Sequence, residues 1–226
     1  MRGQGVLVVP GLSRRTIVAS FVMAAVMLLR VAGRQGEAQP ATPVALLEPD
    51  LLQLFPADHD LPAGLELESS GTREEIAQLA GTFRNSRDAA QLLASWGWVG
   101  NAYRSYSARA GAGRSVPARV EISVHQFRTR IGAAYALSYF AHDHAVAFRH
   151  HERLDELLLP CAAMVTGKGY ATRFLRLGTF LVRVTVVMPA SADAEADTTA
   201  LTMATELALA VLAKAGAASS PPNATC

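Results

Sequence analysis

The sequence has little lysine, little cysteine and no motif that names a reaction. Lysine occurs only at Lys168 and Lys214, and the 226 residues include two cysteines. No Gly-x-Ser-x-Gly elbow is present, which leaves nucleophilic hydrolysis with little support. The segment "TGKGY" lacks the spacing of a phosphate-binding loop. These absences favour a non-enzymatic protein, although they do not exclude an active site of another kind.

The N-terminal segment has the pattern of an export signal. The stretch from Thr16 to Leu29 carries no charge, and as a helix it would span about 21 Å, less than the ~30 Å hydrocarbon core of a bilayer. Arg14 and Arg15 stand directly before it and resemble the twin-arginine signal, although the usual Phe-Leu pair is replaced by Ile-Val. We therefore predict that residues 1–38 are a twin-arginine-like signal peptide. An uncleaved membrane anchor is the alternative.

Most of the net positive charge belongs to this signal. The whole chain has 21 basic and 19 acidic residues. Residues 1–38 hold five arginines and one glutamate, so the remainder has 16 basic and 18 acidic residues and a net charge of −2. Nucleic-acid binding needs a clustered basic face that displaces counterions from phosphates. The composition therefore argues against a nucleic-acid partner.

The rest of the chain is predicted to form a linker, one domain and a tail. Residues 39–60 mix prolines, acids and short apolar pieces, as expected of a linker with a short helix. Residues 61–216 are long enough for a single domain with its own core. Residues 217–226 have the composition of a flexible tail, so the sequence leaves open whether Cys161 and Cys226 pair.

Two pairs of strands are predicted within the domain. "NAYRSYSAR" and "RVEISVHQF" form the first pair, and the second strand alternates apolar with polar residues. Gly178-Thr179 is predicted as the two-residue turn of a second hairpin, with a positive φ at the glycine. The core-facing residues would be Val120, Ile122, Val124, Phe180, Val182, Val184, Val186 and Met188. The opposite, wet face would carry Glu121, Ser123, His125, Arg183 and Thr185.

Helices are predicted before and after each strand pair. Thr72 and Glu75 have the spacing of a capping box, and Ser86 is a plausible cap for a second short helix. Apolar stripes predict further helices at residues 46–54, at 130–148 and from about 197 to 216. The order is two β-β-α units preceded by short helices. This order predicts an α+β domain in which helices pack on an antiparallel sheet of about four strands.

Several segments together resemble small exported bacterial α+β domains of unknown function, which are often lipoproteins. The resemblance covers roughly residues 60–190 and is carried by "DLPAGLEL", "GTREEIAQLA", "LLASWGWVGNAYRSYSA", "VEISVHQFRTRIGAAYALSYFA" and "LRLGTFLVRVTVV". It consists mostly of apolar spacing around a Trp-Gly-Trp. The resemblance implies an exported domain and brings no activity with it.

Histidines are concentrated in one segment, "AHDHAVAFRHHERLDE". Four of the six histidines of the chain lie there, at His142, His144, His150 and His151. Neutral imidazoles bind zinc or copper, so these residues are candidate metal ligands. On a continuous helix, however, only His144 and His151 would share a face. The alternative is that His144 is a partly buried core residue and the others are solvated.

Aromatic residues are interleaved with polar residues in "SWGWVGNAYRSY". Trp96, Trp98 and Tyr103 could stack on a sugar or another planar ligand, with Asn101 and Arg104 as polar anchors. Aromatic residues that close a small core at a corner between a helix and a strand have the same pattern. The sequence leaves both interpretations open.

Three arginines fall on the second hairpin. With Gly178-Thr179 as its turn, Phe174 pairs with Arg183 and Arg176 pairs with Leu181. This register places Arg176 and Arg183 on one face and Arg173 on the other. Arg176 and Arg183 could bind an anion together, or they could be solvated or ion-paired.

Two functional hypotheses follow. The first is an exported non-enzymatic α+β domain that binds a protein partner or a small ligand outside the cytoplasm. The alternative is an exported metal-binding protein that holds zinc or copper through the histidines at 142–151. The export machinery would be a further partner, through Arg14 and Arg15, and membrane contact would be transient unless the signal stays uncleaved.

Overall fold

A computed structural model describes residues 48–148, 151–154, 161–190 and 195–218. The predicted signal peptide, most of the predicted tail and His150 lie outside these residues. The described helices and strands are, in chain order, α1 (Glu48–Gln53), η1 (Asp58–Asp60), β1 (Leu65–Arg73), α2 (Ile76–Ala80), α3 (Ser86–Ser95), β2 (Trp98–Ala108), β3 (Arg119–Phe127), α4 (Arg130–Phe148), β4 (His151–Leu154), β5 (Ala162–Gly167), β6 (Tyr170–Leu177), β7 (Phe180–Val187) and α5 (Glu195–Ala218).

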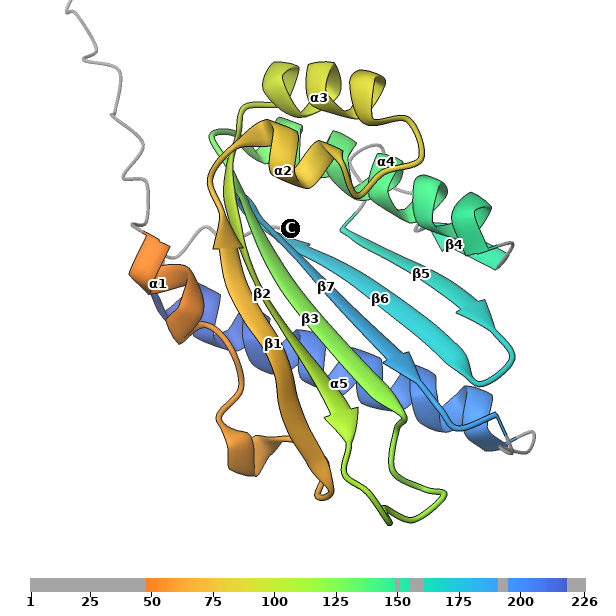
Figure 1. Cartoon of the computed structure of the whole chain (residues 1–226). Helices are drawn as coiled ribbons and strands as arrows, with labels where there is room; N and C mark the ends of the chain where they lie inside the picture. Colours follow the sequence, from red (N-terminus) through yellow and green to blue (C-terminus); the bar gives the residue numbers. More distant parts are fainter. Residues whose placement is uncertain (1–47, 149–150, 155–160, 191–194, 219–226) are drawn as a thin grey trace, which may run out of the picture. The chain divides into compact units, whose positions relative to one another are not determined.

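The strands form one antiparallel sheet of seven strands in the order β1-β2-β3-β7-β6-β5-β4. The sheet consists of two meanders, β1 to β3 and β4 to β7, which meet where β3 pairs with β7. Helix α4 carries the chain from the middle of the sheet to its far edge (Figure 1). The α+β class is confirmed, but the prediction of about four strands and of two β-β-α units is wrong.

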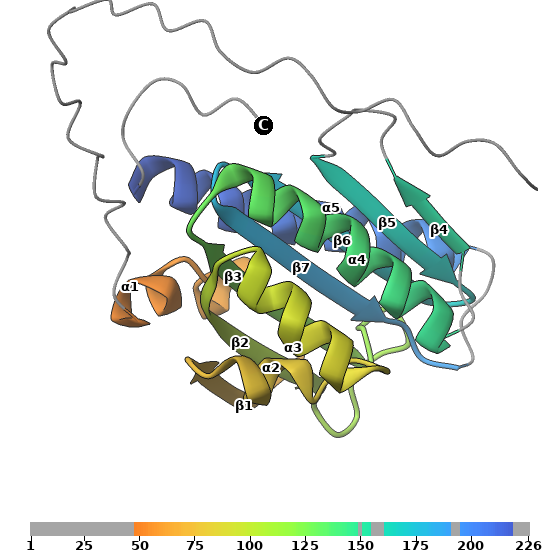
Figure 2. The same cartoon turned by 90° about the horizontal axis from the view of Figure 1, so that it is seen from above.

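Helices cover both faces of this sheet. Helices α2, α3 and α4 lie over one face, and α5 with α1 lies over the other (Figure 2). The α5 face is apolar throughout its middle, because β3 and β7 alternate and turn valine and isoleucine toward α5. Leu51, Leu54 and Phe55 of α1 and its following turn join this core, and Lys214 of α5 donates a hydrogen bond to the Phe55 carbonyl oxygen at 2.7 Å.

Helix α5 is long and apolar enough to cross a membrane by composition alone, with a mean hydropathy of 1.2 over Glu195–Gly216. Its inner residues Ala200, Ala204 and Val211 are fully buried against the sheet. A core helix of a soluble domain passes the same test of length and composition. The hydropathy of α5 therefore carries no inference about a membrane.

The second hairpin has the predicted register. Leu177 pairs with Phe180, and Phe174 pairs with Arg183, across a turn in which Gly178 has φ of 58°. A positive φ is easily adopted by glycine and rarely by other residues, which explains the turn. A second tight turn, with Gly169 at φ of 64°, joins β5 to β6 within "TGKGY".

Two predicted helix starts are wrong. Thr72 lies within β1, and α2 begins after Glu75 without a side-chain cap, so the capping-box spacing is coincidental. The cap of α3 is Asn85, whose side chain accepts a hydrogen bond from the Asp88 amide at 3.3 Å, and Ser86 is the first helical residue. In both cases the true start is one to three residues from the predicted one.

Candidate functional site

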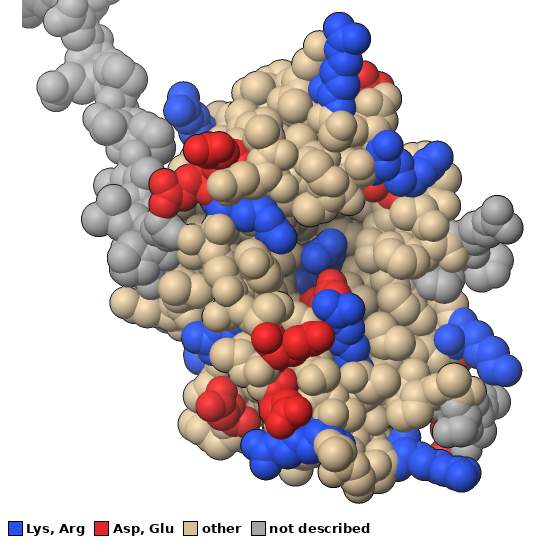
Figure 3. All heavy atoms as spheres, viewed as in Figure 1, with Lys and Arg blue, Asp and Glu red and all other residues tan. Residues whose placement is uncertain are grey.

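The face of the sheet beneath α2 and α4 contains a groove with a cavity of about 300 Å³. Strands β1, β2, β3, β6 and β7 form its floor, and α2 with its following turn and α4 form its other walls. Figure 3 shows a hollow on this face, with basic and acidic side chains inside it. A smaller hollow of about 150 Å³ adjoins the cavity and shares Arg73, Glu121 and Arg183 with it.

Strand alternation places the polar side chains of the floor. On β3, Val120, Ile122 and Val124 point toward α5, so the residues between them project into the groove. Two of these, Ser123 and His125, are only 1% and 3% exposed. The prediction that this face of β3 is wet is therefore wrong at these two positions, because α2 and α4 cover it.

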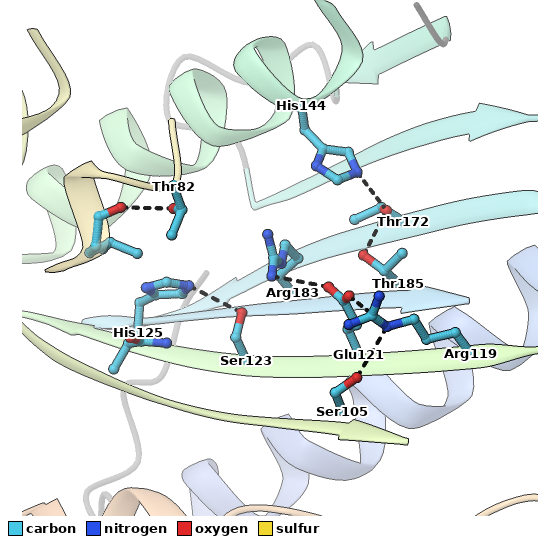
Figure 4. A network of polar contacts seen from close by, with 12 residues as sticks. Thr82, Ser105, Arg119, Glu121, Ser123, His125, His144, Thr172, Arg183 and Thr185 are labelled. Atoms are coloured by element: carbon cyan, nitrogen blue, oxygen red, sulfur yellow. Dashed lines mark hydrogen bonds and ion pairs between the residues drawn. The ribbon is translucent and has the colours of Figure 1, made fainter. Parts of the chain in front are cut away.

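Ser123 and His125 form a buried pair at the centre of the floor (Figure 4). Ser123 Oγ and His125 Nε2 share a hydrogen bond of 3.2 Å, and the imidazole meets the ring of Phe140 edge-on, with 5.0 Å between ring centroids. Burial holds the pKa of His125 well below its ordinary value of 6.5, and Arg183 and Arg73 lower it further. The imidazole is therefore neutral at physiological pH. Its Nδ1 atom is buried and has no hydrogen-bond partner in the described part of the chain.

Arg73 enters the groove from β1. Its guanidinium donates to Asn101 Oδ1 at 3.2 Å and lies 4.2 Å from the centre of the Tyr103 ring. Burial lowers the pKa of Arg73, Tyr103 raises it, and the neighbouring charge of Arg183 lowers it. An arginine stays protonated despite such shifts, so the groove holds a fixed positive charge here.

Arg183 of β7 also lines the groove. Among the described residues, Glu121 is the only one whose carboxylate forms an ion pair with it. The Arg183 NH2 group lies 3.6 Å from Glu121 Oε2, while its Nε atom is buried without a partner among the described residues. Arg119 competes for the same carboxylate, with Nε 3.0 Å from Glu121 Oε1. One acid thus serves two guanidinium groups.

The wall next to β6 contains His144 of α4. Its Nε2 atom is hydrogen-bonded to the Tyr170 hydroxyl and lies 3.1 Å from Thr172 Oγ1, which in turn lies 2.9 Å from Thr185 Oγ1. Burial raises the pKa of Tyr170. Figure 4 shows His144 descending from α4 onto these threonines. This network joins α4 to the sheet and closes one end of the groove.

The histidines proposed as metal ligands are only partly described. His144 lines the groove, whereas His142, two residues earlier on α4, is exposed. The described residues contain no group of three or more histidine, cysteine, aspartate or glutamate side chains placed to hold a metal. His150 lies outside the described residues, as does the side chain of His151. Binding of zinc or copper therefore stays a prediction.

The two tryptophans of the predicted aromatic platform lie outside the groove. Trp98 is 5% exposed and belongs to the core beneath α3 and α4. Trp96 packs edge-on against Tyr139 of α4, with 5.5 Å between ring centroids. Both side chains help to attach the helices to the sheet.

The three other residues of that platform are divided between the faces of β2. Asn101 lines the large cavity and Tyr103 the smaller hollow. The Arg104 guanidinium lies 5.1 Å from the ring centre of Phe55, on the α1 side of the sheet. Asn101 and Tyr103 both contact Arg73, which makes them part of the groove rather than of a flat stacking surface.

The predicted pair of Arg176 and Arg183 shares a face of the sheet, as the register requires. Arg176 is buried, does not line the cavity, and donates to Cys161 Sγ at 3.4 Å. Cys161 is disulfide-bonded. In the cavity, the second guanidinium group, besides that of Arg183, belongs to Arg73 and not to Arg176.

Arg73 lines the groove and was not named as a candidate in the sequence interpretation. Thr72 was predicted to cap a helix, whereas β1 continues through it up to Arg73. The available signal was Leu65 and Leu67 in alternation with Glu66 and Glu68, which indicates a strand. That alternation is then interrupted by a bulge between Leu67 and Ser69.

Comparisons with known proteins give one similar structure. No protein-family model matches the chain, and no curated protein matches it. The chain is similar to the crystal structure of the extracellular domain of PknH from Mycobacterium tuberculosis, with 14% sequence identity and a TM-score of 0.47. The match covers 76% of this chain and 96% of the other. A similarity this low carries no inference about function.

Proposed function

We propose that the protein is an exported, non-enzymatic domain that binds a small ligand in the groove outside the cytoplasm. The observation that carries the proposal is a cavity of about 300 Å³ whose lining includes His125 and Arg183. The Nδ1 atom of His125 and the Nε atom of Arg183 are buried and have no hydrogen-bond partner among the described residues. Leaving such a group unpaired costs about 1–3 kcal/mol. A bound ligand that supplies the missing hydrogen bonds would offset this cost.

The Ser123–His125 pair favours binding over catalysis. A serine nucleophile needs a base that a third group orients, usually a carboxylate on the second ring nitrogen. Here the second nitrogen of His125 has no partner among the described residues, and Ser123 is almost fully buried. The pair therefore lacks the third member and the exposure that acyl transfer requires.

The binding proposal is tested by blocking the groove. Ala147 is exposed on α4 and lines the cavity, so Ala147→Trp fills the opening without disturbing the core. Ala210→Trp is the matched control, because Ala210 is exposed on α5, behind the sheet. A panel of small molecules is then screened by thermal melting of the purified protein.

We expect at least one compound to raise the Tm of the wild type and of Ala210→Trp, but not of Ala147→Trp. Equal stabilisation of both variants, or no stabilisation of the wild type by any compound, would contradict the proposal. A hydrolase screen is run in parallel. Turnover that is lost in Ser123→Ala would replace the binding role with a catalytic one.

The export part of the proposal is carried by residues 1–38 and is tested separately. The intact mass of protein recovered from outside the cytoplasm should match a chain that begins near Gln39. Replacing both Arg14 and Arg15 with lysine should hold the protein in the cytoplasm if the twin-arginine route is used. Full-length protein in the membrane fraction would show instead that the segment is an anchor.

A further inference from the structure

The groove has two chemically different sides. The sheet side carries the guanidinium groups of Arg73 and Arg183. The helix side carries Leu79, Phe83 and Phe140, which belong to or pack against the apolar cluster beneath α2, α3 and α4. Asp143 and His144 of α4 line the cavity as well. A ligand that fills the cavity would therefore meet cationic donors on the sheet side and the apolar surface of Leu79, Phe83 and Phe140 on the helix side.

The positive charge on the sheet side is incompletely matched. Glu121 is shared between Arg119 and Arg183, at 3.0 Å and 3.6 Å, and Arg119 also lies 3.7 Å from Glu68 Oε2. Arg73 contacts an amide oxygen and an aromatic ring, and no ion pair is found for it among the described residues. Two guanidinium groups inside a covered groove favour an anion between them, because arginine presents a donor fork that fits a carboxylate.

The other acid that lines the cavity is Asp143 of α4. Burial raises the pKa of its carboxyl group, whereas the backbone and the charge of Arg84 lower it. Arg84 lies in the turn between α2 and α3. Asp143 thus lies near this turn, and no ion pair joins it to Arg73, which has no paired acid among the described residues.

Two buried atoms that have no hydrogen-bond partner among the described residues belong to residues on this cationic side. One is Arg183 Nε, which is a donor, and the other is Nδ1 of His125, which is neutral, nine-tenths buried or more, and lines the cavity. A guanidinium N–H can only donate, so the atom that completes Arg183 has to be an acceptor. An oxygen of an acid group meets this requirement.

Size limits the ligand as well. Ligand pockets commonly measure about 300–1,000 Å³, and this cavity of about 300 Å³ lies at the lower limit. A short chain or a single ring bearing one acid group is therefore of the right size.

We infer that the ligand is a small amphiphilic carboxylate, held with its acid group between Arg73 and Arg183 and its apolar body against Phe83 and Phe140. This inference rests on the proposed function and specifies its ligand class. The orientation follows from the two sides of the groove, since the reverse orientation would place a charge against hydrocarbon.

The test uses defined probes and isothermal titration calorimetry. Octanoate and 3-phenylpropionate are compared with octanamide and 3-phenylpropionamide, which have the same shape without the charge, and with octyl phosphate. We expect the wild type to bind at least one carboxylate at least tenfold more tightly than its amide. An amide that binds as tightly as its acid, or octyl phosphate that binds more than tenfold more tightly than octanoate, would overturn the carboxylate assignment.

Charge variants locate the acid group. Arg73→Gln and Arg183→Gln should each weaken carboxylate binding at least tenfold, whereas Arg87→Gln, an equal charge change on the exposed face of α3, should leave it unchanged. Equal affinities for all three variants would overturn the inference. If a glutamine variant does not fold, Arg73→Lys replaces it, because lysine keeps the positive charge but lacks the donor fork of arginine. Arg73→Lys should bind the carboxylate several-fold more weakly than the wild type. The ratio of acid affinity to amide affinity in the wild type tests the carboxylate assignment independently of any variant.

The two proposals fail in different ways. If neutral compounds bind in a manner blocked by Ala147→Trp while the carboxylates do not bind, the binding function stands and the carboxylate inference falls. If no compound binds, both fall. Carboxylate binding that Ala147→Trp does not affect would place the acid outside the groove and would also overturn the inference.

Discussion

The two faces of the sheet are built from the same strands and have opposite characters. On β3 and β7, one face presents Val120, Ile122, Val124, Val182 and Val184, all fully buried beneath α5. The other face presents Glu121, Ser123, His125, Arg183 and Thr185, of which Ser123, His125 and Thr185 are also buried. One covered face is a core, and the other is a groove.

The difference lies in how the helices cover each face. Helix α5 runs along an apolar face and packs closely against it, whereas α2, α3 and α4 make their apolar contacts around Trp98, Phe127 and Leu137. The polar middle of the sheet is left beneath them with a cavity. A polar strand face is therefore not always a solvated face, and buried polar residues that line a cavity indicate a binding site.

The largest effect on stability is expected from a comparison of two neighbouring residues on opposite faces of β3. Ile122→Ala removes a fully buried side chain from the α5 face and should cost about 2–5 kcal/mol of unfolding free energy. Ser123→Ala removes one hydrogen bond from His125 and should cost about 1–2 kcal/mol. Urea unfolding measures both values. An equal cost for the two variants would show that the groove floor is packed like the core.

The attachment of α4 gives the next largest effect. A Cβ atom at Gly132 would overlap the carbonyl oxygen of Trp96, so α4 can approach the end of α3 only with glycine here. Gly132→Ala should therefore destabilise the protein by about 1–3 kcal/mol. Gly113→Ala is the control, because its Cβ would meet nothing nearer than Ser115 Oγ at 3.9 Å. Equal melting temperatures for the two variants would contradict this packing.

The buried imidazole predicts a pH dependence of stability. Burial lowers the pKa of His125 in the folded protein below 6.5, so the unfolded chain binds the proton more readily. The stability that His125 contributes is therefore fully present above pH 6.5 and falls as the pH decreases below this value. The slope for one proton is about 1.4 kcal/mol per pH unit until the folded pKa is reached. His125→Gln should lose less stability than the wild type between pH 7 and pH 5. Parallel curves from urea unfolding would refute this assignment.

The smallest effect concerns the acid on the groove floor. Glu121 is about one-third exposed, and its ion pairs should contribute less than about 1 kcal/mol, so Glu121→Gln should change stability little. It removes the carboxylate that competes for Arg183, so octanoate affinity should rise about three- to tenfold. Glu66→Gln, at an exposed position of β1, is the control. Weaker octanoate binding by Glu121→Gln would show that this acid supports the site.

Much of the fold could be predicted from the sequence where periodicity is strong. Strand β3, helix α4 and the register of the β6–β7 hairpin agree with the predictions, because each has a clear alternation, a clear stripe or a turn glycine. Strands β1, β4 and β5 were missed. β1 contains a bulge, and β4 is only four residues long.

The candidate site was less predictable for a related reason. Its residues come from β1, β2, β3, β6 and β7 and from α2 with its following turn and α4, and no local pattern indicates which face of the sheet the helices cover. Arg183 and Asn101 were named as candidates, but Arg73 was hidden by the false capping box at Thr72. Burial of Ser123 and His125 depends on packing between distant segments, which a single sequence does not display.

The most direct test of the groove is methyl NMR during titration with octanoate. Leu79 lines the cavity beneath α2, while Ile122 and Val184 lie on the α5 face of the same sheet. We expect the Leu79 methyl resonances to shift in a saturable manner while those of Ile122 and Val184 stay in place. Shifts confined to the α5 face, or no shift at any of the three, would contradict a binding site in the groove.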